Sequence, residues 1–174
     1  LLVLASCQMF GGDIDDAINP AIGIELFHNF TLLHDDIMDE APLRRGKESV
    51  YKKWNSNVAI LAGDTMFAVA NKYMLRTKPH AISQVVELFN QTAIEVCEGQ
   101  QFDMDYEKQQ NVSIPDYIEM IRLKTAVLLA ASLKTGAIIA GADTVDCNHI
   151  YDFGINIGLA FQIKDDLLDV YGDQ

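Results

Sequence analysis

Apolar residues recur along most of this sequence at steps of three and four, a spacing that gathers them on one face of a helix. The clearest run lies between residues 21 and 39. Its apolar positions are Ile22, Leu26, Phe30, Leu33 and Ile37. The run predicts an amphipathic helix over 21–39, followed by a loop in the polar stretch that contains Pro42 and Gly46.

Helical patterning continues further along the chain with few turn-forming residues. More helices are expected over 57–76, over 81–107, from 113 through Lys124 toward Gly136 and Gly141, and over 146–171. Ser113, with Asp116 three residues later and Pro115 in the first turn, resembles a capping box. Because no alternating strand pattern and no internal repeat accompanies these stretches, the sequence predicts an all-α fold.

Length and composition favour one globular domain. The chain has 174 residues, of which 49% are hydrophobic and 22% charged, enough to bury a core. The net charge of -12 argues against nucleic acid or an anionic membrane as a partner, because both are bound by excess lysine and arginine. A phosphate-bearing substrate is still compatible with this charge if cations lie between the substrate and clustered carboxylates.

Cysteine usage and hydropathy favour a cytoplasmic protein without a stable membrane span. Cys7, Cys97 and Cys147 are far apart and odd in number, so they imply neither a disulfide framework nor a zinc site. The most apolar stretch, residues 125–142, contains a lysine and two glycines, and it predicts a buried core helix. The opening Leu-Leu-Val-Leu does not resemble a secretory signal, and we expect it to be part of a longer helix.

Two copies of the pattern DDxxD are the main chemical feature of the chain. The first ends the helix at 21–39 and the second lies near the end of the last helix; their aspartates are Asp35, Asp36, Asp39, Asp165, Asp166 and Asp169. A helix brings side chains three and four residues apart within about 5–6 Å of one another. Such carboxylates repel, and the helix macrodipole disfavours negative charge near a C-terminal end. Both clusters therefore need a compensating cation.

Magnesium is the cation that fits this pattern best. It is a hard ion that takes one or two carboxylates, keeps several waters and shares its other positions with substrate phosphates. A calcium EF-hand is a poor alternative, because its loop spacing is absent. A single DDxxD could be a solvated acidic helix end, but two copies with matching apolar flanks favour a metal site.

Each cluster continues a polar stripe along its own helix. The residues that carry the stripes toward the clusters are His28, Thr31, Gly158 and Gln162. A polar stripe inside an apolar helix is unfavourable to bury unless it lines a site. We therefore expect the two helices to face each other across a cavity that holds a diphosphate through bound cations.

The order of short motifs resembles that of the trans-type polyprenyl diphosphate synthases. The motifs are Leu-Leu-His-Asp-Asp-Ile-Met-Asp, Leu-Arg-Arg-Gly-Lys, Gly-Asp-Thr, Glu-Gly-Gln, Leu-Lys-Thr-Ala and Ala-Phe-Gln-Ile-Lys-Asp-Asp-Leu-Leu-Asp. They cover essentially the whole chain in the family's order. The resemblance implies an isoprenoid-synthase-type helical bundle around a central cavity, in which residues 1–174 form a single catalytic domain truncated at both ends.

The resemblance also assigns metal ligands. Asp35 and Asp39 match the first and last aspartates of a motif that binds two magnesium ions, and Asp165 matches the aspartate that holds a third. Asp36, Asp166 and Asp169 are the other aspartates of the two motifs. With two ions at the first motif and one at the second, the resemblance implies three Mg²⁺ ions per active site.

Further matches fall on substrate-binding positions. The isopentenyl diphosphate side is matched by His28 and Arg45, the allylic side by Arg44, Lys124, Thr125 and Gln162, and a polar pair lining the cavity by Gln100 and Asp103. Arg44, Lys124 and Thr125 are also expected to act in catalysis. The alternative is that the arginines are solvated loop residues and that Lys124 snorkels from a core helix.

The implied reaction is a head-to-tail condensation of isopentenyl diphosphate with an allylic diphosphate. The allylic diphosphate ionises, the double bond attacks, and the released diphosphate takes the proton. Phe30 lies five residues before Asp35, about 7.5 Å along the helix, and its ring would stop the growing chain. Phe30 also resembles the residue found at this position in the family's shorter-chain producers. With the small Thr31 beside it and no insertion in the first motif, the resemblance favours a C20 product, geranylgeranyl diphosphate, with C15 as the next choice.

Two other functions stay open from the sequence. A terpene cyclase on the same fold usually has a mixed Asn/Ser/Glu second motif, and a non-catalytic subunit of a partner synthase would not need two intact clusters. The family's basic motif ahead of the first residues, and the lysines after the second cluster, are not found here, so we expect an incomplete site in this chain. Homodimerisation is expected from the resemblance alone.

Overall fold

Polar residues cap the starts of α2, α4, α6 and α8. In the computed structural model, which describes residues 1–172, the Asp13 carboxylate accepts a hydrogen bond from the Asp15 amide and starts α2 (Ile14–Met38). Further caps are Asn55 before α4 (Ser56–Met74), Ser113 before α6 (Ile114–Ile121) and Asp143 before α8 (Thr144–Tyr171). These side chains satisfy amide groups that the first helical turn leaves without a partner.

The other elements are also mostly helical. They are α1 (Leu2–Met9), α3 (Val50–Lys53), α5 (Ile82–Tyr106), the π-helical turn η1 (Arg122–Ala126), α7 (Val127–Ala140) and the paired strands β1 (Leu43–Arg44) and β2 (Lys47–Glu48). The predicted all-α class is confirmed.

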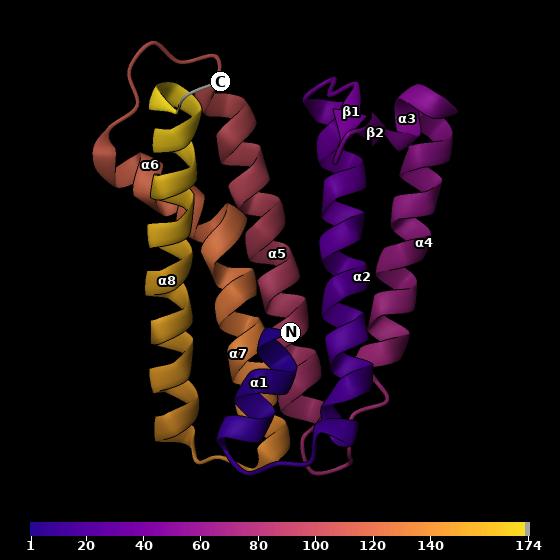
Figure 1. Ribbon diagram of the computed structural model, residues 1–174, viewed down its shortest axis with the longest axis vertical. Helices are drawn as coiled ribbons and strands as arrows, with labels where there is room; N and C mark the ends of the chain where they lie inside the picture. Colours follow the sequence, from indigo (N-terminus) through magenta and orange to yellow (C-terminus); the bar gives the residue numbers. More distant parts are fainter. Residues whose placement is uncertain (173–174) are drawn as a thin grey trace.

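The long helices lie alongside one another in two groups (Figure 1). Helix α2 packs on α4, while α7 is surrounded by α1, α5 and α8. The two groups meet in a core that includes Phe27 of α2, Phe89 of α5 and Val127 of α7, all almost fully buried. The C-terminal ends of α2 and α8, which carry the two aspartate clusters, lie at the same end of the bundle (Figure 1).

Several boundaries differ from the predicted ones. Helix α2 begins at Ile14 rather than at residue 21, and Pro20 is buried inside it. The predicted loop after α2 contains a short hairpin and α3, and the hairpin turn has positive φ angles of 53° at Arg45 and 75° at Gly46. Positive φ at both central residues is what a two-residue hairpin turn requires.

The apolar segment that was considered for a membrane span is part of the core. The continuous helix formed by α6, η1 and α7 is long and apolar enough to cross a membrane, but most of its apolar window is buried inside the fold. The prediction of a buried core helix in this region is confirmed. The predicted continuation of this helix through Lys124 is also confirmed, and the structure adds a π-helical turn at Arg122–Ala126 within it.

Candidate active site

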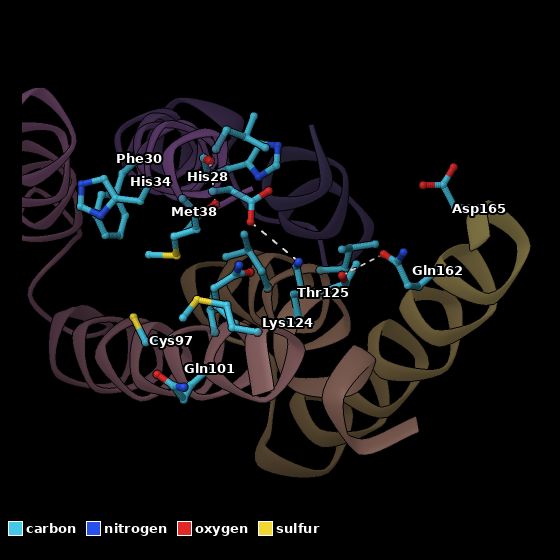
Figure 2. Close-up of a pocket in the computed structure, with 18 of the residues that line it drawn as sticks. His28, Phe30, His34, Met38, Cys97, Gln101, Lys124, Thr125, Gln162 and Asp165 are labelled. Carbon is cyan, nitrogen blue, oxygen red and sulfur yellow. Dashed lines mark hydrogen bonds and ion pairs between the residues drawn. The ribbon is translucent and has the colours of Figure 1, made fainter. Parts of the chain in front are cut away.

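A cavity of about 480 Å³ lies where α2, α5, η1 and α8 meet, and it gathers residues from both aspartate clusters. Figure 2 shows residues of α2, α5, η1 and α8 around this space. Ten of the predicted site residues line it: His28, Phe30, Thr31, Asp35, Arg44, Gln100, Lys124, Thr125, Gln162 and Asp165. The expected arrangement of α2 and α8 across one cavity is therefore confirmed.

The first cluster divides between the cavity and the protein. Asp35 lines the cavity, whereas Asp36 is only 3% exposed and forms an ion pair with Arg44 at 2.6 Å. The Arg44 Nε donates a second hydrogen bond to Asp36 at 2.8 Å, and this bond is the main reason why the pKa of Arg44 is raised. Asp39 follows the last residue of α2 as its C-cap.

The hairpin explains why Arg44 can reach Asp36. Its tight turn brings β2 back against β1, with Arg44 opposite Lys47, and so holds Arg44 over the end of α2. The Arg44 guanidinium also lies 3.7 Å from Asp35. Arg45, by contrast, occupies the turn and is exposed, so the structure does not bring it to the cavity wall.

Lys124 connects the first cluster to α5. Its Nζ lies 2.5 Å from Asp103 and 3.7 Å from Asp35. Burial lowers the pKa of Lys124, but the hydrogen bond to Asp103 and the charge of Asp35 outweigh burial and raise it. The pKa of Asp39 is raised by burial and by the neighbouring Asp35. The first cluster thus contains crowded carboxylates that are balanced in part by Lys124 and Arg44.

Two glycines allow η1 to lie between α5 and α8. A Cβ atom on Gly99 would lie 2.2 Å from the Lys124 backbone nitrogen, and one on Gly158 would lie 2.6 Å from the Ala126 Cα. Real Cβ atoms do not come so close, so only glycine permits these approaches. The wide turn of η1 presents both Lys124 and Thr125 to the cavity. The sequence predicts Gly158 as part of the polar stripe of α8. In the structure it instead allows α8 to pack closely against η1.

The second cluster also divides between cavity and protein. Asp165 lines the cavity, and Figure 2 shows it on the α8 side, apart from the labelled residues of α2. The two oxygens of Asp166 accept hydrogen bonds from the Tyr117 hydroxyl and from Gln162 Nε2, the latter at 2.8 Å. Gln162 Oε1 in turn accepts a hydrogen bond from the Thr125 hydroxyl at 3.0 Å. Asp169 is exposed beyond the cavity wall.

The carboxylates that face the cavity suit a hard divalent cation. Asp35 lines the cavity from α2 and Asp165 lines it from α8, while Asp39, the C-cap of α2, lies outside the cavity wall. Among residues 1–172, no three His, Cys, Asp or Glu side chains converge closely enough to hold a metal by themselves. The donor set therefore fits an ion that takes one or two carboxylates and completes its coordination with oxygens of a ligand.

Aromatic side chains close the other end of the cavity. The Phe30 ring stacks on Phe67 with centroids 5.2 Å apart and also packs against Phe27 and His34. Beyond it lies a second cavity of about 500 Å³ between α2, α4 and α5. Phe30, Cys97 and Gln101 line both cavities and so separate them.

Some site residues were not predicted. His34 precedes the first cluster directly, and this adjacency could have identified it. No sequence pattern indicates that Tyr117 or Cys97 belongs to the site, because each reaches it only through the packing of α6 and α5. Gln100, which was predicted, has a buried Nε2 without a hydrogen-bond partner among the described residues. Burial lowers the pKa of His28, which lines the same cavity.

Comparisons with known proteins agree with this geometry. The polyprenyl synthetase family profile matches residues 1–174. A geranylgeranyl pyrophosphate synthase crystal structure is 53% identical, with a TM-score of 0.97, over 99% of this chain and 53% of its own. A geranylfarnesyl diphosphate synthase of Natronomonas pharaonis is 44% identical over 91% of this chain and 47% of its own length.

One similar protein was solved with ligands bound. A polyprenyl synthase of Caulobacter crescentus, solved with calcium and isoprenyl diphosphate, is 35% identical, with a TM-score of 0.91, over 97% of this chain and 50% of its own. The chain thus spans about half the length of the proteins that it matches.

Proposed function

Because the chain belongs to the polyprenyl synthetase family, we propose that the protein condenses isopentenyl diphosphate with an allylic diphosphate to form a longer linear polyprenyl diphosphate. The observation that carries this proposal is the single cavity that has aspartates of both clusters at one end and aromatic rings at the other. A charged head and an apolar tail are the two parts of the proposed substrates.

Magnesium is the proposed cofactor, with three ions per active site. Direct ligation is assigned to Asp35, Asp39 and Asp165, because Asp36 and Asp166 already bond to Arg44 and Tyr117. When bound, the ions would neutralise charge on the departing diphosphate. Asp169 lies one turn beyond Asp165 and completes the second cluster at the rim.

The residues of the chain supply binding and polarity around the reacting atoms. Arg44 and Lys124 can donate to the allylic diphosphate, and such preorganised donors usually provide the largest catalytic effect. Thr125 and Gln162 turn oxygen atoms toward the place where the carbocation forms. Gln100 offers its unpaired amide to a ligand, and His28 with Arg45 is assigned to isopentenyl diphosphate. The released diphosphate is the proposed acceptor of the proton.

The proposal is tested by incubating the intact gene product with magnesium, isopentenyl diphosphate and allylic diphosphates of different lengths. A linear, elongated diphosphate is the expected product. A cyclised hydrocarbon would identify a terpene cyclase, and no product with any substrate would indicate a non-catalytic subunit. Omission of magnesium is the control, and it should abolish product formation.

Geranylgeranyl diphosphate is the proposed main product, with the farnesyl compound next. Phe30 forms the floor of the first cavity, and its stack on Phe67 holds it there. Replacement of Phe30 by alanine would join the first cavity to the second. Phe30→Ala is therefore expected to lengthen the product by at least one isoprene unit, while Phe102→Ala, which removes a ring that lines neither cavity, should not. An unchanged distribution of labelled products in Phe30→Ala would refute this role.

The assembly is proposed from exposed apolar surfaces. Helix α8 exposes the apolar side chains of Phe153 and Ile157, while its Phe161 lines the cavity. Leu61 of α4 and Ile94 of α5 are also exposed, and we assign them to a homodimer contact. Light scattering on the intact gene product tests the dimer. A cytoplasmic location stays a prediction.

A further inference from the structure

A chain of hydrogen bonds joins three elements on the α8 side of the cavity. The Tyr117 hydroxyl of α6 donates to one oxygen of Asp166, and Gln162 Nε2 donates to the other at 2.8 Å. The Thr125 hydroxyl of η1 then donates to Gln162 Oε1 at 3.0 Å. Only Thr125 and Gln162 line the cavity; Tyr117 and Asp166 lie behind them.

We infer that Tyr117 is a positioning residue, which holds Asp166 so that the Gln162 amide turns its oxygen, and not its nitrogen, toward Thr125 and the cavity. The inference rests on the proposed function and identifies a residue that acts on the reacting centre without touching it.

The Gln162 amide has two ends of similar shape and opposite polarity. An ionised carboxylate only accepts hydrogen bonds, so Asp166 can bind the NH₂ end and repels the oxygen end. With its nitrogen held by Asp166, Gln162 must point its oxygen the other way. Bonds to a charged acceptor are about twice as strong as neutral ones, which makes this orientation well defined.

Tyr117 is what keeps Asp166 in this role. Asp166 lies between Asp165 and Asp169 in the sequence, where a free carboxylate could rotate toward the other acidic groups and any cation that they bind. The Tyr117 hydroxyl prevents this by occupying its outer oxygen. Burial, together with the bond to Asp166, raises the pKa of Tyr117 to about 12, so the hydroxyl remains a donor at neutral pH.

The orientation matters for a reaction that creates positive charge. The Gln162 oxygen, and the lone pairs of a Thr125 hydroxyl whose proton points to Gln162, present partial negative charge to the cavity. A flipped amide would present its NH₂ group and oppose a carbocation. Loss of Tyr117 is therefore expected to slow the ionisation step and to leave substrate binding largely unchanged.

The test replaces Tyr117 by phenylalanine in the intact gene product, after the wild type has been shown to form an elongated product. We expect kcat to fall by about tenfold or more, with KM for both substrates changed by less than about twofold. Tyr151→Phe, which removes the hydroxyl of another half-buried tyrosine, is the matched control and should keep wild-type kcat.

A double-mutant cycle separates positioning from a general structural effect. In a Gln162→Ala background, Tyr117→Phe should change kcat by less than about twofold, because the amide that it orients is gone. The same factor in both backgrounds would overturn the inference. So would an unchanged kcat in Tyr117→Phe, or a kcat that high magnesium restores, since the latter would make Asp166 a metal ligand. If the phenylalanine variant does not fold, 4-fluorophenylalanine at position 117 replaces it, because its fluorine fills the place of the hydroxyl without a proton to donate, and an unchanged kcat there overturns the inference equally.

Discussion

The aspartate clusters of α2 and α8 share one sequence pattern but differ in their surroundings. In α2, Asp36 is buried in an ion pair with Arg44, and Asp35 lies within 3.7 Å of both Arg44 and Lys124. In α8, the partners of Asp166 are the neutral groups of Tyr117 and Gln162. Between residues 1 and 172 no Lys or Arg forms an ion pair with Asp165 or Asp169.

This difference shows how one motif can serve two purposes. The α2 cluster is neutralised in part by the protein itself, so it contributes to the fold before any ligand binds. Among the described residues the α8 cluster has no such partner, so under the proposed function its cavity-facing carboxylate would be neutralised by ions that bind with the diphosphate. In both clusters the middle aspartate bonds to a side chain from another element, and the other aspartates are the proposed metal ligands.

The largest expected effect comes from removing the cavity-facing carboxylate of each cluster. Asp35→Asn should lower kcat/KM by about 10³-fold and Asp165→Asn by about 10²-fold, because Asp35 both binds an ion and holds Lys124 in place. Rates of product formation at saturating magnesium measure this. Asp152→Asn, which alters an exposed carboxylate of α8 that lines neither cavity, is the control. A larger loss in Asp165→Asn would reverse the proposed division of roles.

The next effect concerns the middle aspartates and is measured as stability. Asp36→Ala should lower the free energy of unfolding by about 2 kcal/mol, because Arg44 loses a charged partner. Asp166→Ala should lower it by about 1 kcal/mol, since only neutral donors are left unpaired. Urea denaturation of the intact gene product compares them with Asp152→Ala on the exposed side of α8. Equal losses would show that the two surroundings are energetically alike.

The smallest effect is a pH dependence of the α2 cluster. Burial and Asp35 raise the pKa of Asp39 above its ordinary value of 3.8. The folded protein therefore keeps a proton that the unfolded chain has released, and stability falls as the pH rises through this interval. Asp39→Asn should stabilise the ligand-free protein at pH 7 by a few tenths of a kcal/mol, the size of a like-charge pair on a helix. The gain should vanish below the ordinary pKa, and a gain that persists there would contradict this origin.

The sequence predicted most of the helices and half of the residues that line the cavity, because both follow from local spacing. The period of Ile22 to Ile37 predicted α2, and Asp35 and Phe30, five residues apart on this helix, both line the cavity. The start of α2 was predicted too late, since a proline at position 20 usually marks a boundary, whereas here the Asp13 cap begins the helix before it.

The features that sequence could not supply depend on contacts between distant segments. Strands of two residues are too short to show alternation, so the sequence predicts a loop where the structure has the hairpin that carries Arg44. Nothing near Tyr117 indicates that it meets Asp166, which lies on another helix. The π-helical turn likewise depends on Gly99 and Gly158, each contributed by a neighbouring helix.

The π-helical turn makes the site sensitive to the number of residues in this segment as well as to their type. A π-helical turn holds one residue more than the α-helical turn that it replaces. Deletion of a single residue between Arg122 and Ala126 could restore a regular helix with α6 and α7 in nearly the same relative orientation, but it would remove the wide turn that presents both Lys124 and Thr125 to the cavity. Sequences that keep this site must therefore keep the extra residue of this turn, whatever changes elsewhere in the helix.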